Sequence, residues 1–96
     1  MKFDGALIKE QGQIFAIAVV KQHVLTSSDK DSIAQSFKQV FGNIPIVLAA
    51  QDSRGNFKYY GRRDIVRFLS NVHPSQIPWK TYTISWLTNY FYLTCI

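Results

Sequence analysis

The sequence contains little of what enzymes and metal proteins usually need. Cys95 is the only cysteine, so no disulfide can form within the chain. Glu10 is the only glutamate, and no pair of carboxylates suited to acid–base catalysis stands out. Neither His23 nor His73 has a cysteine or acidic residue at metal-ligand spacing, and the motifs HExxH and CxxC do not occur. We therefore expect no metal site, no cofactor and no catalytic residues.

The sequence also lacks an apolar run long enough for a membrane-spanning helix. Asp4 and Gly5 interrupt the N-terminal region where a signal peptide has its apolar core. Residues 81–96 carry no charged side chain, but they are fewer than the roughly 20 apolar residues of a membrane-spanning helix and include Thr, Ser and Asn. These features predict a cytoplasmic protein without membrane contact.

Length and composition indicate a single domain over residues 1–96. The chain is 47% hydrophobic and 18% charged, which is typical of a folded globular domain and argues against disorder. No repeat, low-complexity tract or linker divides it.

Two uninterrupted apolar segments, 14–21 and 45–50, predict strands that are buried on both faces of a sheet. A strand over 3–9 precedes the first of them after a short turn. A strand over 57–60 follows the second after the turn signal at 52–56.

Two helices are expected between and after these strands. The first spans about 29–41, with Ser28 as N-cap, and its apolar residues recur at helical spacing. The second begins near Arg62 and ends at His73-Pro74, because proline cannot continue the hydrogen-bond ladder. The core positions of the two helices are Ile33, Phe37, Val40 and Phe41, and Ile65, Phe68, Leu69 and Val72.

This order of elements, β-β-α-β-β-α(-β), predicts an α+β fold. A right-handed crossover through the first helix makes the two buried strands a parallel central pair in a mixed four- to five-stranded sheet. The strands over 3–9 and 57–60 would flank that pair as antiparallel edges. Residues 80–86 alternate like a further strand, whereas residues 87–96 fit either a strand or a helix.

Positive charge is concentrated in the second half of the chain. The net charge is +5, and residues 51–96 contain six Lys or Arg against two Asp. All four arginines lie between Arg54 and Arg67. This bias predicts an anionic partner, such as a phosphate group or a nucleic acid.

The start of the second helix carries the candidate site. Arg62 and Arg63 lie where free backbone N–H groups and the positive end of the helix dipole attract anions. Arg63 and Arg67 are neighbours at i, i+4, and Lys58 precedes them on a strand face that also carries a ring. Charge beside a stacking ring is typical of proteins that bind single-stranded nucleic acid, although solvated arginines without a ligand are the alternative. The candidate residues are Arg54, Lys58, Tyr60, Arg62, Arg63 and Arg67.

The C-terminal segment is rich in aromatic residues, with six of the fourteen in the last eighteen positions. Such rings either cover an open sheet face or form an interface, where aromatic residues are enriched. A homodimer is expected in the second case. The candidate interface residues are Trp86, Tyr90, Phe91 and Tyr92.

Three functional hypotheses follow. The first is a non-catalytic interaction module that associates with itself through the aromatic segment and an exposed strand. The second is a nucleic-acid- or anion-binding protein that uses the basic segment 54–67. The third is a small enzyme, which would need Asp52, a histidine or tyrosine, and the start of the second helix to meet in one pocket.

Overall fold

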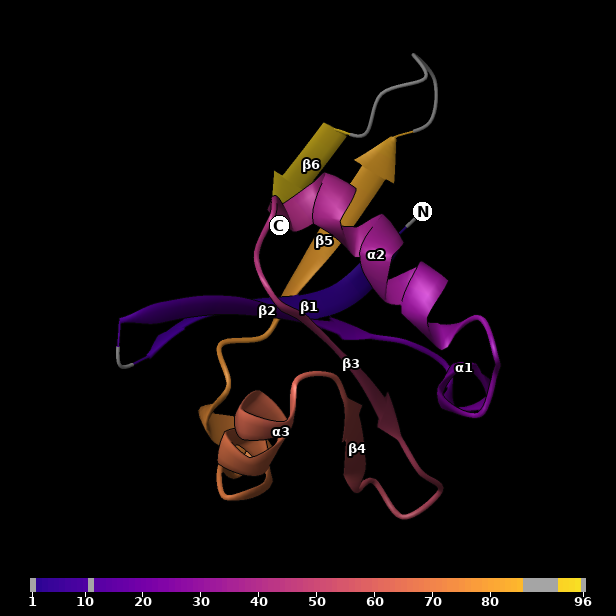
Figure 1. Ribbon diagram of the computed structural model, residues 1–96, viewed down its shortest axis with the longest axis vertical. Helices are drawn as coiled ribbons and strands as arrows, with labels where there is room; N and C mark the ends of the chain where they lie inside the picture. The colour runs from indigo at the N-terminus through magenta and orange to yellow at the C-terminus, as the bar shows by residue number, and fades with distance from the viewer. Residues whose placement is uncertain (1, 11, 86–91, 96) are drawn as a thin grey trace.

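The computed structural model describes residues 2–10, 12–85 and 92–95. Their strands form one six-stranded mixed sheet in the order β4-β3-β2-β1-β5-β6 (Figure 1). Only β2 and β3 pair in parallel among these neighbours. The strands are β1 (Lys2–Glu10), β2 (Gln13–Val19), β3 (Ile46–Gln51), β4 (Phe57–Tyr60), β5 (Lys80–Ser85) and β6 (Tyr92–Cys95).

The helices are α1 (Gln22–Leu25), α2 (Lys30–Phe41), α3 (Arg63–Ser70) and the short 3₁₀ helix η1 (Pro74–Gln76). The α2 helix lies in the connection between the parallel strands, as the crossover requires. The α+β class, the central parallel pair and the two main helices are therefore confirmed. The sheet gains a sixth strand because residues 92–95 pair with β5.

The two main helices pack against opposite faces of the sheet. Phe37 of α2 belongs to a cluster with Ala16, Ala18 and Leu48, whereas Leu69 of α3 belongs to a cluster with strand residues of the opposite parity. The second cluster includes Phe15, Ile17, Val47 and Ala49. The two apolar segments are thus buried on both sides, as their composition predicts.

One expectation about the edges is wrong. Strand β1 does not lie at an edge, because β5 pairs along its other side and places Phe3 opposite Tyr82. Gly5 makes the close packing here feasible, since a Cβ on Gly5 would lie 2.6 Å from the carbonyl oxygen of Ile17. The edges of the described sheet are β4 and β6.

The predicted cap of the first long helix is also wrong. Asp29, not Ser28, occupies the N-cap position of α2, and its side chain makes no capping hydrogen bond. The Ser27 hydroxyl instead accepts a hydrogen bond from the Asp29 N–H at 3.0 Å. This local turn precedes the helix and moves its start to Lys30.

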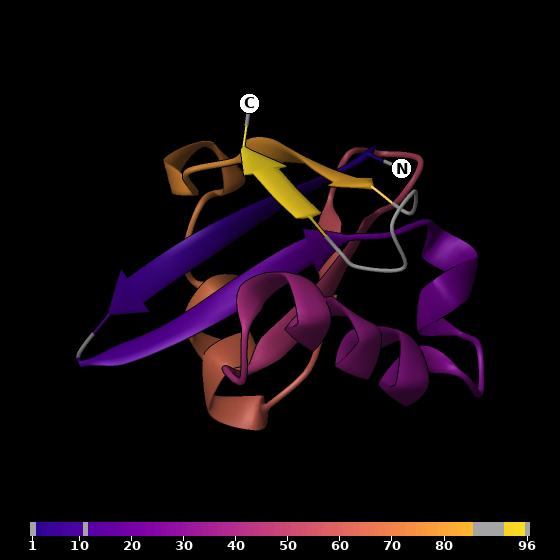
Figure 2. The same ribbon diagram turned by 90° about the horizontal axis from the view of Figure 1, so that it is seen from above.

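The β1–β2 hairpin reaches beyond both helices (Figure 2). On this hairpin Leu7 and Ile14 are 51% and 45% exposed. None of the helices in the described part of the chain is long and apolar enough to cross a membrane.

Candidate functional site

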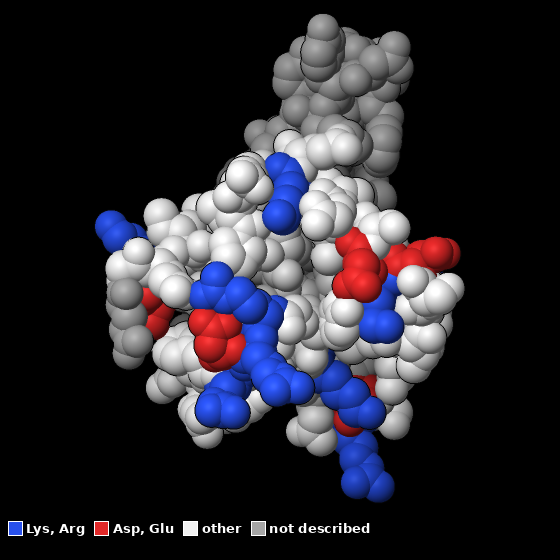
Figure 3. All heavy atoms as spheres, in the orientation of Figure 1, with Lys and Arg blue, Asp and Glu red and all other residues white. Residues whose placement is uncertain are grey.

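Cations gather at one end of the molecule, over α3 and β4, with a few acidic side chains among them (Figure 3). Four exposed cations define what we call the basic surface: Arg54, Lys58, Arg63 and Arg67. Arg54 lies in the β3–β4 turn, Lys58 lies in β4, and the other two lie on α3. None of the four side chains has a hydrogen-bond or ion-pair partner among the described residues.

The β3–β4 turn is held by Asp52. Its Oδ1 accepts hydrogen bonds from the backbone N–H groups of Arg54 at 2.8 Å and Asn56 at 3.0 Å. Gly55 has a positive φ of 86°, which a residue with a side chain rarely adopts. Asp52, the carboxylate considered above for an enzyme, thus acts as a turn former, and the turn places Arg54 before the start of β4.

Arg62 differs from the other arginines because its side chain is already paired within the chain. Its guanidinium donates to both carboxylate oxygens of Asp64, at 2.8 and 2.7 Å, and to Oε1 of Gln13 at 2.8 Å. The hydrogen bond from Arg62 lowers the pKa of Asp64 to about 2, and the same bond raises the pKa of Arg62. The cation at the start of α3 is therefore balanced within the chain.

Tyr60 is turned away from the α3 arginines. Its hydroxyl donates a 2.6 Å hydrogen bond to Asp31 of α2, and Nζ of Lys30 lies 5.1 Å from the ring centroid. Its ring packs against the cluster on the α2 face of the sheet. The structure therefore brings Arg63 and Arg67 together on α3, but it does not place Tyr60 beside them.

A hollow that the sequence did not suggest runs between β4 and α3. It has a volume of about 760 Å³. We call it the β4–α3 groove; its apolar lining is Phe57, Tyr59, Val66 and Leu69. The polar and remaining lining residues are Gln51, Gly55, Asn56, Lys58, Ser70, Val72, His73 and Pro74.

The rings of β4 form part of a stack on the α3 face. The Phe57 ring lies 6.2 Å from the Tyr59 ring and 5.3 Å from the Trp79 ring, nearly parallel to both. The Tyr59 hydroxyl is buried without a hydrogen-bond partner in the described structure, and this burial raises its pKa. In the sequence, Phe57 and Tyr59 lie two positions apart in a predicted strand, and this spacing already indicated that their rings share one face.

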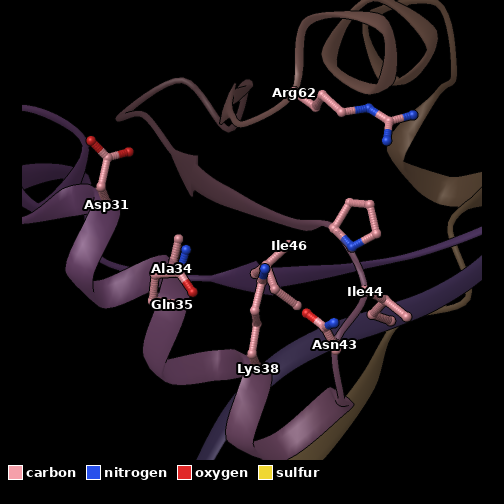
Figure 4. Close-up of a pocket in the computed structure, with 9 residues that line it drawn as sticks. Asp31, Ala34, Gln35, Lys38, Asn43, Ile44, Ile46 and Arg62 are labelled. Atoms are coloured by element: carbon pink, nitrogen blue, oxygen red, sulfur yellow. The ribbon is translucent and has the colours of Figure 1, made fainter.

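A second hollow, of about 480 Å³, lies between α2 and the segment that leads into β3 (Figure 4). Asp31 and Lys38 on α2 and Arg62 across from them contribute charges of both signs. Because Arg62 is already bound by Asp64 and Gln13, this hollow offers less free charge than the basic surface.

The predicted interface residues cannot be placed in the same way. Trp86, Tyr90 and Phe91 lie outside the described residues, and Tyr92 is the first residue of β6. Within the described ranges, no group of three His, Cys, Asp or Glu residues is arranged to hold a metal ion.

Comparisons with family models, with characterised proteins and with solved structures give no match to this chain. Among the described residues, the β4–α3 groove, whose lining includes Lys58 of the basic surface, is the feature best suited to binding a partner.

Proposed function

We propose that the protein is a non-catalytic interaction module that binds an acidic protein partner through the basic surface beside β4. The observation that carries this proposal is the grouping of unpaired cations on α3, β4 and the turn before β4, with Lys58 among the residues that line the β4–α3 groove. Like charges held close together repel one another, and an anionic partner relieves that repulsion. Such a surface also accelerates association with an oppositely charged partner.

The aromatic groups favour a protein over a nucleic acid. A single-stranded nucleic acid needs exposed rings on which its bases stack, next to the cations. Tyr60 is engaged by Asp31 and Lys30 on the α2 side, whereas Phe57 and Tyr59 lie in the groove. An apolar groove with a charged rim matches the usual anatomy of a protein interface.

Binding of two labelled polyanions tests the proposal. We expect poly-L-glutamate to bind in fluorescence anisotropy at 50 mM salt and to bind more weakly at 200 mM salt, because salt screens exposed charges. The double variant Arg63→Gln/Arg67→Gln should lose this binding. Lys9→Gln/Lys21→Gln removes the same charge elsewhere and should retain it.

Single-stranded RNA serves as the competing probe in the same assay. If RNA binds more tightly than polyglutamate, and Arg63→Gln/Arg67→Gln abolishes that binding, the result would support nucleic-acid binding instead. If neither polyanion binds at low salt, the basic surface has no such role.

Self-association is the second candidate, and a specific observation favours it. Leu7 and Ile14 are exposed large apolar residues on the β1–β2 hairpin, and their cross-strand partners Ala16 and Lys9 place them on one face. Burying such a patch against a second copy is favourable. Sedimentation should show a dimer that Leu7→Gln/Ile14→Gln converts to monomer; a monomeric wild type removes this candidate.

A further inference from the structure

We infer that the β4–α3 groove takes an extended acidic segment of a partner protein, which pairs with β4 as an added strand. This inference rests on the proposed function and specifies the form of the partner. It depends on three features of the described residues: the open edge of β4, the apolar groove beside it and the cations of the basic surface.

The first feature is the free side of β4. This strand lies at one end of the sheet order and, among the described strands, pairs only with β3, in the register Leu48↔Tyr60 to Gln51↔Phe57. In a β-strand, alternate backbone N–H and C=O groups point to opposite sides, so β4 directs half of these groups away from β3. An extended peptide can satisfy them by adding a strand.

The second feature is the apolar groove under that free side. A strand added beside β4 projects every second side chain toward the face that α3 covers. There it meets Phe57 and Tyr59 from β4 and Val66 and Leu69 from α3. The volume of about 760 Å³ lies within the range of roughly 300–1,000 Å³ that ligand sites occupy. The segment should therefore carry apolar residues at alternate positions.

The third feature is the positive charge on the elements that form the groove. Lys58 lines the groove from β4, and Arg54 lies in the turn before that strand. Arg63 and Arg67 share one side of α3 with Ser70, at the spacing i, i+4 and i+7, and Ser70 lines the groove. The residues between the apolar positions of the segment project to the opposite face, which Lys58 shares with Tyr60, so acidic residues at those positions would meet Lys58. Arg63 and Arg67 add positive charge on the α3 side.

The same charges argue against a second copy as the occupant. Antiparallel pairing of two β4 strands would bring Lys58 of both copies to one seam. Like charges placed opposite one another across strands are destabilising. An acidic segment would instead be attracted to these cations. We therefore assign the groove to a partner of opposite charge.

The test uses the full chain and labelled ten-residue peptides of alternating Val and Glu. In NMR titrations of the ¹⁵N-labelled protein, the Val and Glu peptide should shift the amide resonances of residues 57–60 and 63–70. A version N-methylated at every second residue keeps its charge but cannot complete strand pairing, and we expect it to bind at least tenfold more weakly. The alternating Val and Lys peptide should not bind.

Two matched serine substitutions locate the site. The Ser70 hydroxyl donates to the Val66 carbonyl, and the Ser36 hydroxyl donates in the same way to the Ile33 carbonyl of α2. Ser70→Glu adds negative charge at the groove and should weaken binding of the acidic peptide about tenfold. Ser36→Glu adds the same charge on the other face and should leave the affinity within twofold.

The outcomes separate this inference from the proposed function. If the N-methylated peptide binds as tightly as its parent, strand addition is overturned while binding of an anionic partner stands. If polyglutamate binds but the Val and Glu peptide leaves residues 57–60 unshifted, the groove is not the site. Shifts of those residues on raising the concentration of the protein alone, together with a dimer mass, would assign the groove to a second copy.

Discussion

Arg62 and Asp64 show how a single ion pair removes a residue from a candidate site. Asp64 follows Arg62 by two positions and accepts two hydrogen bonds from its guanidinium, while Gln13 accepts a third from β2. An arginine at the positive end of a helix is unfavourable by itself, and an acid in the first turn offsets it. The charge of Arg62 is thus used to join the start of α3 to β2.

The first prediction concerns this pair. In Arg62→Gln, the pKa of Asp64 should rise from about 2 toward its ordinary value of 3.8, because the charged donor is gone. A carboxyl group whose pKa is lower in the folded state stabilises the fold above its unfolded pKa, and this contribution is lost as the pH falls toward 2. NMR titration of the Asp64 carboxyl measures the shift, and Arg63→Gln is the control. An Asp64 pKa still near 2 in Arg62→Gln would show that another group sets it.

A second prediction concerns the two adjacent tyrosines of β4. The Tyr59 hydroxyl is buried without a partner among the described residues, whereas the Tyr60 hydroxyl bonds to Asp31. Tyr59→Phe keeps the stacked ring and removes an unsatisfied group, so the free energy of unfolding should rise by about 1 kcal/mol. Tyr60→Phe loses a hydrogen bond and should lower it. Urea unfolding of both variants checks the contrast, which a loss of stability in Tyr59→Phe would contradict.

At the scale of elements, the helices and the central strands follow from local pattern. Ile65 and Leu69 of α3 are buried, as their helical spacing predicts, and Phe68 packs at the edge of the same cluster. The predicted range of about 29–41 matches α2 closely, but its N-cap was missed because Ser27, rather than Ser28, closes the preceding turn. Competing hydroxyl groups one residue apart offer similar local bonds, so composition does not decide between them.

The third prediction concerns Gly5 in β1. A Cβ there would lie 2.6 Å from the Ile17 carbonyl oxygen and 3.3 Å from the Tyr82 ring. Gly5→Ala should therefore displace β1 from β2 and cost about 3 kcal/mol of stability. Gly12→Ala is the control: its φ of 79° is strained for alanine, but apart from its chain neighbours no described atom would lie within 4 Å of the added Cβ, so about 1 kcal/mol is expected.

Urea unfolding ranks the two glycine variants, and hydrogen exchange locates the damage. Protection of the Ile17 amide and its neighbours should fall in Gly5→Ala and persist in Gly12→Ala. Equal costs in the two variants would mean that β1 and β2 separate more easily than their contacts indicate.

At the scale of the whole molecule, the two apolar clusters lie back to back on shared strands. Ala16 and Ala18 of β2 belong to the cluster under α2, while Ile17 between them belongs to the cluster under α3. If the shared strands separate from one helix, the strand residues of both clusters become exposed. The two faces of the sheet should therefore unfold together.

The fourth prediction tests this coupling. Phe37 packs edge-on against Phe3 at 5.0 Å on the α2 face, whereas Trp79 packs against the cluster on the α3 face. In a Trp86→Phe background, Phe37→Ala should cost about 3–5 kcal/mol, reported equally by Trp79 fluorescence and far-UV circular dichroism. Leu69→Ala should do the same from the other side. Separate transitions for the two probes would show that the faces unfold independently.

The amino-acid sequence by itself determined the types of the main elements and the parallel central pair. Continuous apolar runs and helical spacing are local signals, because burial on two faces or along one stripe leaves its period in the chain. The concentration of arginine between Arg54 and Arg67 is also local, since these residues are close in sequence.

The tertiary structure alone decided which of these residues share a surface. Tyr60 faces α2 and bonds to Asp31, while Arg63 and Arg67 lie on the helix that covers the opposite face. Contacts such as Arg62 to Gln13, or the pairing of Phe3 with Tyr82, depend on strand order and register. Those properties arise from how distant segments pack together, and so the β4–α3 groove exists only in the folded chain.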